Sequence, residues 1–177
     1  MDISSYRGVL VFAEQRNGQI QKVAFELLGV GRRIADKREE PLTAVLVGSG
    51  LTEAHSADLI AQGADRVILV DHPELAVYRT EPYTQALAKV VETFQPGILY
   101  VGATTLGRDL APRVSARVRT GLTADCTSLE IEDGTRNLLM TRPAFGGNIM
   151  ATIICPEHRP QMSTVRPGVM RKLERDE

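Results

Sequence analysis

Two segments in the second half of the chain carry residue types that suit the binding of a phosphate or another anion. The first, residues 102–108 (GATTLGR), lies between an apolar run and an amphipathic stretch, and so between an expected strand and an expected helix. Ligands of open α/β sheets bind at such strand ends, where free N–H groups at a helix start attract anions. We therefore predict that Thr104, Thr105 and Arg108 mark a nucleotide crevice. The alternative is structural: Thr105 caps the helix and Gly107 makes a tight turn.

The second segment, residues 142–148 (RPAFGGN), breaks the chain between two expected strands. Its two adjacent glycines permit positive φ and a sharp reversal. Arg142 always carries charge on a planar fork of donors. A flat heterocycle such as a flavin benefits from such a group near its carbonyl oxygens, because reduction builds negative charge there. The alternative is a glycine turn in which Arg142 pairs with a carboxylate. The predicted cofactor-binding residues of this segment are Arg142, Phe145, Gly146, Gly147 and Asn148.

No nucleophile in the sequence has an activating base close to it. Cys126 has no neighbouring histidine, and we favour a buried, inert thiol. The three histidines, His55, His72 and His158, are scattered, and no CxxC motif is present, so we expect no metal site. We therefore predict no catalytic residue, and a surface that holds and hands over a cofactor.

Composition and charge exclude several classes of partner. The 177 residues carry a formal net charge of −1, and aromatic residues make up 5%. We predict no nucleic-acid partner, because there is no basic footprint and there are few rings for base stacking. No apolar stretch approaches the roughly 20 residues of a membrane-spanning helix, so we predict no membrane insertion. The first residues lack the features of a signal peptide, and two separate thiols suit a reducing compartment, so we expect a cytoplasmic protein.

Strand and helix patterns alternate through the first two thirds of the chain. Continuous apolar runs, typical of strands buried on both faces, occupy residues 8–13, 42–47, 66–70 and 98–101. Helical patterns follow them at residues 20–34, 52–62, 83–94 and 106–118. Four such units predict a three-layer α/β fold with a mostly parallel sheet and helices on both faces.

The pattern then changes to shorter strands. The further strand candidates are residues 128–132, 136–141, 149–155 and 162–165. Asp133-Gly134 predicts a hairpin turn between the first two. We expect these segments to add antiparallel edge strands to the sheet. Residues 171–177 are highly charged and predict a linker or a frayed end.

Five motifs resemble the alpha subunit of electron-transferring flavoprotein, and they occur in the order found in that family over residues 7–170. They are residues 12–18 (FAEQRNG), 102–112 (GATTLGRDLAP), 120–126 (TGLTADC), 142–148 (RPAFGGN) and 164–168 (TVRPG). The glycine pair before Asn148 is similar to anaerobic bacterial members, some of which bifurcate electrons.

The resemblance implies a fold and a role. Residues 1–170 would form the N-terminal α/β domain, similar to adenine nucleotide alpha-hydrolases, and residues 171–177 a linker toward a C-terminal FAD domain absent from this chain. The domain would pack on the beta subunit of a heterodimer that carries electrons through FAD between an acyl-CoA dehydrogenase-type redox partner and another carrier, with bifurcation left open. Arg142 and residues 145–148 would face a flavin across the subunit interface. The resemblance implies that this fragment alone holds no FAD tightly and acts as an electron-carrier subunit.

Two other interpretations remain. One is a stand-alone adenine-nucleotide-binding module of the universal-stress type, with ATP or AMP at the loop that begins at Gly102. The missing Gly-x-Gly-x-x-Gly series and the missing Gly-Lys-Ser/Thr sequence count against it. The other is a dimerisation scaffold with no ligand.

Overall fold

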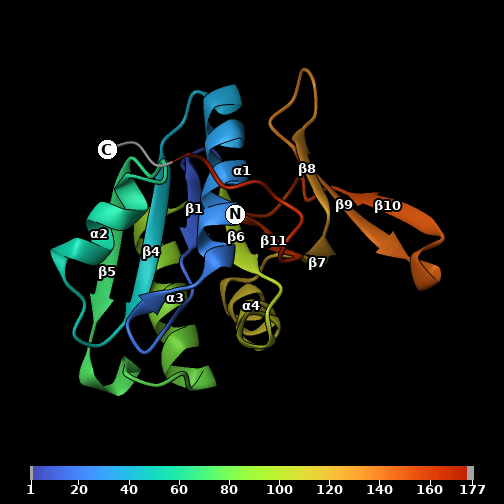
Figure 1. Ribbon diagram of the computed structural model, residues 1–177. Helices are drawn as coiled ribbons and strands as arrows, with labels where there is room; N and C mark the ends of the chain where they lie inside the picture. The colour runs from blue at the N-terminus through green and yellow to red at the C-terminus, as the bar shows by residue number, and fades with distance from the viewer. Residues whose placement is uncertain (1, 175–177) are drawn as a thin grey trace.

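The computed structural model describes residues 2–174 and places a six-stranded parallel sheet at the centre of the molecule (Figure 1). In chain order, its strands are β1 (Val9–Phe12), β4 (Leu42–Gly48), β5 (Arg66–Asp71), β6 (Ile98–Gly102), β7 (Leu122–Cys126) and β11 (Gln161–Val165). They lie in the order β5-β4-β1-β6-β11-β7. β1, β6 and β11 are buried along their whole length, which explains the apolar runs of the first two.

Helices cover both faces of the sheet and complete three layers. They are α1 (Lys22–Arg38), α2 (Glu53–Ile60), α3 (Thr80–Phe94) and α4 (Thr105–Val118). The side chains of β1 alternate between two cores: Val9 and Val11 pack with α1 and α2, whereas Leu10 and Phe12 pack with α3 and α4. A short 3-10 helix, η1 (Pro73–Leu75), precedes α3. The predicted three-layer α/β fold is confirmed.

The antiparallel strands form sheets of their own. β8 (Ser128–Ile131), β9 (Leu138–Ala144) and β10 (Ile149–Ile153) make a three-stranded sheet in the order β10-β9-β8. A 3-10 turn, η2 (Phe145–Gly147), joins β9 to β10. β2 (Gln15–Arg16) and β3 (Gln19–Ile20) form a small hairpin after β1.

The three-stranded sheet is fixed to the body at β8. Arg33 of α1 donates hydrogen bonds of 2.7 Å to both the Glu130 carboxylate and the Leu129 carbonyl oxygen, and Lys37 donates one of 3.2 Å to the carbonyl oxygen of Ile131. β9 and β10 run outward from this base and project from the body (Figure 1). We call residues 143–154, the outer part of this ribbon, the arm.

Two strands differ from the sequence-based expectation. Residues 162–165 do not join the antiparallel set, because β11 lies between β6 and β7 and is parallel to both. β7 was not predicted, because its residues show no strand pattern; it contains Asp125 at φ +61°. The central sheet is therefore wholly parallel, and the antiparallel strands form a small sheet of their own beside β7.

The segment after β11 returns across α1. The backbone N–H of Gly168 donates a hydrogen bond of 2.7 Å to the buried carboxylate of Glu26. Further along, a Cβ on Gly29 would lie 2.1 Å from the carbonyl oxygen of Arg171, so the two backbones touch. The predicted linker, residues 171–177, thus has its described part packed on α1, while residues 175–177 lie outside the described residues.

Candidate functional site

β1 and β6 form the switch point of the parallel sheet. From β1 the chain moves outward to β4 and β5 on one side, then crosses to β6 on the other. Loops that leave a sheet in opposite directions open a crevice at the carboxyl ends of the strands. Thr104 and Thr105 follow β6 at this point, and α4 begins at Thr105. The 102–108 segment therefore lies at the switch point, between a strand and a helix as the sequence predicted.

Thr104, and not Thr105, caps α4, which corrects the sequence-based alternative. Its hydroxyl accepts a 3.0 Å hydrogen bond from the Gly107 N–H and donates one of 2.6 Å to Oε2 of Glu14. Glu14 follows β1 and is only 1% exposed. The protein's own carboxylate thus lies against the first turn of α4, where N–H groups would otherwise face a bound phosphate.

The two glycines of this loop serve close packing. A Cβ on Gly107 would lie 1.8 Å from the carbonyl oxygen of Gly102, and one on Gly102 would lie 2.8 Å from Cγ2 of Val23. α4 and α1 therefore approach β6 more closely than any side chain would allow. Close packing of the helices on β6 therefore accounts for both glycines, and no bound phosphate is needed to explain them.

A cavity of about 660 Å³ opens beside the start of α4. Thr105 lines it, with the hairpin of β2 and β3 on one side. Asp109 lies on its wall and accepts 2.6 Å hydrogen bonds from Tyr78 and Thr80. Burial, together with the hydrogen bond to Asp109, raises the pKa of the Tyr78 phenol, so Tyr78 stays a donor. Arg108 does not line this cavity.

Arg108 turns instead toward a charge cluster at the end of β7. Its Nε donates to the Ala103 carbonyl oxygen at 3.0 Å, and its Nη2 lies 3.9 Å from Oδ1 of Asp125. Asp125 accepts two hydrogen bonds from Arg166, of 3.1 and 2.6 Å. These bonds lower the pKa of Asp125, and the charges of Arg166, Arg108 and Arg142 lower it further. One carboxylate faces three guanidinium groups, so the cluster carries a net positive charge suited to an anion.

Arg142 connects this cluster to the arm. Its side chain is half-buried, and its Nε is buried with no hydrogen-bond partner among the described residues. Cys126, the last residue of β7, lies near enough for the charge of Arg142 to act on its thiol, although burial is the larger effect and raises its pKa to about 12. The interpretation of Cys126 as a buried thiol agrees with its exposure of 0%.

The tip of the arm is a glycine turn, as the sequence predicted. Phe145, Gly146 and Gly147 have φ values of +47°, +71° and +89°, and Ala144 pairs with Ile149 across the turn. Phe145 is 84% exposed although its backbone adopts a conformation that a bulky residue rarely takes. Phe145, Gly146, Gly147 and Asn148 are thus placed at the tip, apart from the Arg108 side of the cluster.

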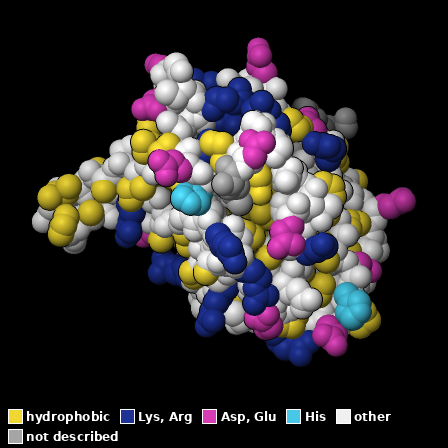
Figure 2. Space-filling model, turned by 180° about the vertical axis from the view of Figure 1, so that it is seen from behind, with side chains coloured by type: hydrophobic (Ala, Val, Ile, Leu, Met, Phe, Trp, Pro, Cys, Tyr) yellow, Lys and Arg dark blue, Asp and Glu magenta, His cyan; other side chains and the backbone are white. Residues whose placement is uncertain are grey.

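Apolar side chains cover the arm on the outside. Figure 2 shows them gathered on the part that projects from the body. The exposed large hydrophobic residues of the arm are Phe145, Ile149, Met150, Ile153 and Ile154. Residues 143–156 contain no charged side chain. Exposed apolar area that is continuous and uncharged marks an interaction surface.

Comparison with known proteins identifies the family. A family model described as "Electron transfer flavoprotein domain" matches residues 9–177. This chain belongs to the electron transfer flavoprotein family. It is 57% identical over 176 residues to Protein FixB of Clostridium saccharobutylicum, covering 99% of this chain and 52% of that protein. It is 55% identical over 173 residues to electron transfer flavoprotein subunit alpha of Clostridium acetobutylicum, covering 98% and 51%.

Relatives with other names match the same stretch of this electron transfer flavoprotein domain. The lactate dehydrogenase (NAD(+),ferredoxin) subunit LctC of Acetobacterium woodii is 47% identical over 175 residues, covering 99% of this chain and 41% of that protein. The chain spans about half the length of the curated relatives it matches. The predicted resemblance to flavoprotein alpha subunits, including those of anaerobic bacteria, is confirmed.

Sequence reasoning missed the residues that organise this flavoprotein domain's carboxyl edge. Glu14, Asp125 and Arg166 lie inside three of the family motifs, but none of the three was predicted to be a site residue. The chain offered one indirect signal, because Asp125 and Arg166 lie in two of the motifs that resemble the family. Among residues 2–174, no group of acidic, histidine or cysteine side chains could hold a metal ion. None of the helices described is long and apolar enough to cross a bilayer.

Proposed function

We propose that this chain is the N-terminal domain of an electron transfer flavoprotein alpha subunit, acts as an electron-carrier subunit and packs on a beta subunit. In the complete heterodimer it would carry electrons through FAD between an acyl-CoA dehydrogenase-type enzyme and another carrier. The names of the relatives support the family part of this proposal. The name of LctC, which pairs NAD(+) with ferredoxin, supports bifurcation. The two cysteines are free, which suits a cytoplasmic location.

The observation that carries the proposal is the arm beside the arginine cluster. The arm offers a partner protein an apolar, uncharged ribbon, and its base holds Arg142 next to Asp125 and Arg166. A partner that covers the arm would also exclude water from the cluster. Burial of that kind strengthens charge interactions, because the local dielectric constant falls.

The residues at this edge fit the anionic side of a flavin. The Nε of Arg142 is buried without a partner among residues 2–174, and the cluster has more cations than its one carboxylate neutralises. When bound, a flavin supplies one- and two-electron transfer. Arg142 would hold a positive charge beside the ring, Asp125 would keep Arg108 and Arg166 oriented, and residues 145–148 would close the edge of the site together with the beta subunit.

Co-expression of this chain with a beta subunit of the same family from the same organism tests the proposal. We expect the tagged chain to capture the beta subunit in equal amounts, with an interface that survives gel filtration. A chain that stays alone with a correctly folded beta subunit present would refute the packing part of the proposal. The visible absorption spectrum of the complete heterodimer then tests for FAD.

A second candidate, a stand-alone adenine-nucleotide module, is favoured by the 660 Å³ cavity beside Thr105. It is opposed by the buried carboxylate of Glu14 at the start of α4, because that charge repels a phosphate from the helix N–H groups. Calorimetric titration of the isolated chain with ATP and AMP separates the two functions. The flavoprotein proposal expects weak or no binding, and the module expects saturable binding without a partner.

A further inference from the structure

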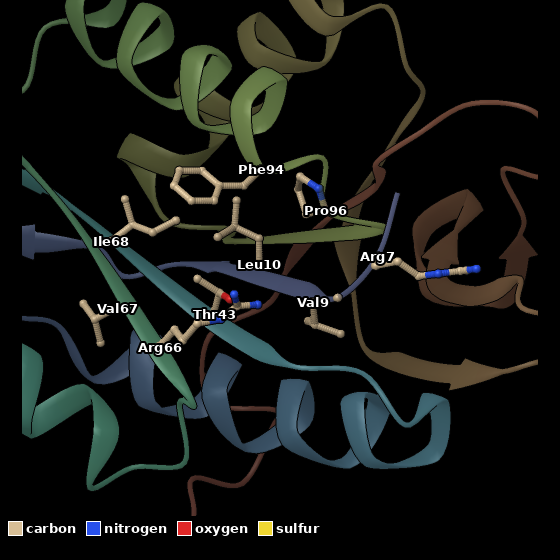
Figure 3. Close-up of a pocket in the computed structure, with 10 residues that line it drawn as sticks. Arg7, Val9, Leu10, Thr43, Arg66, Val67, Ile68, Phe94 and Pro96 are labelled. Atoms are coloured by element: carbon tan, nitrogen blue, oxygen red, sulfur yellow. The ribbon is translucent and has the colours of Figure 1, made fainter. Parts of the chain in front are cut away.

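A second cavity, of about 530 Å³, lies at the opposite edge of the parallel sheet (Figure 3). The cavity opens at the amino ends of β1, β4 and β5, under the last turn of α3. Leu10, Thr43 and Arg66 are in register across these three strands. Leu10 belongs to the core on the α3 face, and Ile68, two residues after Arg66, packs against the same core. The row Leu10–Thr43–Arg66 therefore forms the floor of the cavity.

Most of the cavity wall is apolar. Figure 3 shows Phe94 and Pro96 above Leu10, with Ile68 beside them. Phe94 is the last residue of α3 and is 55% exposed, so one side of its ring remains available. The volume lies in the range of sites that hold small ligands. An apolar body would gain burial against Leu10, Ile68 and Phe94.

Arg66 supplies the one charge that the cavity can use. Figure 3 shows its side chain extending toward Thr43 along the floor. Within residues 2–174, the Arg66 guanidinium makes no hydrogen bond or ion pair. Its charge acts on its acidic neighbour, Asp65, but the Asp65 carboxylate binds Arg32 and the N–H of Leu42. The other arginine at this site, Arg7, points away from the cavity and lies 3.9 Å from Glu40. A free guanidinium fork beside an apolar wall matches a carboxylate joined to an apolar chain.

We infer that this cavity binds a small amphipathic carboxylate, of the straight-chain fatty-acid type. The carboxylate pairs with Arg66, and the aliphatic chain lies between Phe94 and the floor of the sheet. The site is at the far edge of the sheet from the arginine cluster around Asp125. It therefore goes beyond the proposed electron-transfer role and does not depend on it.

Titration of the chain with octanoate, followed by calorimetry and by NMR shifts of the Phe94 ring, tests this site. We expect saturable binding of octanoate. Octanamide keeps the chain and removes the charge, and acetate keeps the charge and removes the chain. Both should bind at least about tenfold more weakly, since a charge-assisted hydrogen bond and the buried chain each contribute that much. Equal affinity for octanoate and octanamide would overturn the proposal, as would no octanoate binding.

Two variants locate the site. Arg66→Gln should weaken octanoate binding about tenfold, since it removes the charge from an exposed edge position. Arg113→Gln changes an exposed arginine on α4. It is the matched control and should bind octanoate as the unchanged chain does. Phe94→Ala should also weaken octanoate binding and leave the preference over octanamide intact. Unchanged binding in both Arg66→Gln and Phe94→Ala would show that octanoate binds elsewhere.

Discussion

The hydroxyl of Thr104 donates a hydrogen bond of 2.6 Å to the carboxylate of Glu14 and so connects the end of β1 to the start of α4. The same hydroxyl caps the helix through the Gly107 N–H. One side chain therefore satisfies a buried charge and a helix terminus together. This contact also fills the switch point of the sheet with a negative group that belongs to the protein.

Thr104→Val should lower the free energy of unfolding by about 2 kcal/mol, because it removes a helix cap and the shorter of the two hydrogen bonds to the buried Glu14 carboxylate, the other coming from Arg16. Urea unfolding followed by circular dichroism measures the loss. Thr104→Ser keeps the hydroxyl and is the control, with an expected change near zero. An equal loss in both variants would mean that the methyl group of Thr104, and not its hydroxyl, stabilises this point.

Arg142→Ala in the complete heterodimer should weaken flavin binding by about tenfold, which corresponds to one charge-assisted contact. It should also make the flavin potential more negative, since a positive charge beside the ring favours the reduced, more anionic form. Absorbance titration and a redox titration measure the two effects. Arg113→Ala should change neither. If affinity and potential both stay constant in Arg142→Ala, Arg142 does not contact the flavin.

The double variant Phe145→Ser, Ile149→Ser should abolish capture of the beta subunit, because both side chains are exposed on the arm and lose their apolar surface. Co-purification with a tagged chain measures capture. Ile60→Ser is the matched control, since Ile60 is 45% exposed on α2, and it should capture the beta subunit normally. The double variant should keep its urea midpoint. If the double variant captures the beta subunit as well as the unchanged chain does, the arm is not part of the interface. The assignment to the family would not change.

The Glu40 carboxylate should make the free energy of unfolding fall as the pH is lowered into the acid range. Burial acts to raise its pKa, but hydrogen bonds from Arg38 and the Gly8 N–H, and the charge of Arg136, outweigh burial and hold it below its usual value. The resulting stabilisation is present above the unfolded pKa of about 4.3 and is lost as pH falls through the folded pKa. Glu40→Gln should lose about 3 kcal/mol at pH 7, because it breaks a buried ion pair.

Urea unfolding of Glu40→Gln between pH 7 and pH 3 tests this dependence. The difference from the unchanged chain should shrink as pH falls below about 4. Glu92→Gln, exposed on α3, is the control and should show no such trend. A difference that stays constant down to pH 3 would contradict the assignment to the Glu40 carboxylate.

Thiol labelling at pH 8 should modify Cys155 and spare Cys126. Burial raises the pKa of Cys126 to about 12 and excludes reagent, whereas Cys155 is partly exposed. The Cys155→Ser variant should therefore take up no label in the native state and one equivalent in denaturant. Fast native labelling of Cys155→Ser would show that the edge of β7 opens.

The strand–helix units were predictable because the hydrophobic pattern of each segment matches its burial in the fold. β1 and β6 are buried on both faces, so their apolar runs appear directly in the sequence. β7 has no such run. It is a strand because β11 pairs with it, through a register shift between Ser163 and Val165, and that pairing joins residues about 40 positions apart. A local sequence pattern therefore cannot reveal the pairing of β7 with β11.

The parts of the candidate site that depend on local sequence were also predictable. The loop after β6 and the glycine turn at Gly146 and Gly147 are local features. The hydrogen bond from Thr104 to Glu14 joins residues 90 apart, and the Asp125–Arg166 pair joins residues 41 apart. Such contacts exist only after the strands have taken their order in the sheet.

The uncharged arm has a consequence for the cell that makes this domain. β10 is an edge strand whose outer side pairs with no other strand among residues 2–174, and it has no lysine, glutamate or proline to discourage pairing with a neighbouring chain. Copies of the domain that meet at high concentration can therefore join edge to edge. In the proposed heterodimer, synthesis of the beta subunit in matched amounts would cover this strand and keep it from aggregating.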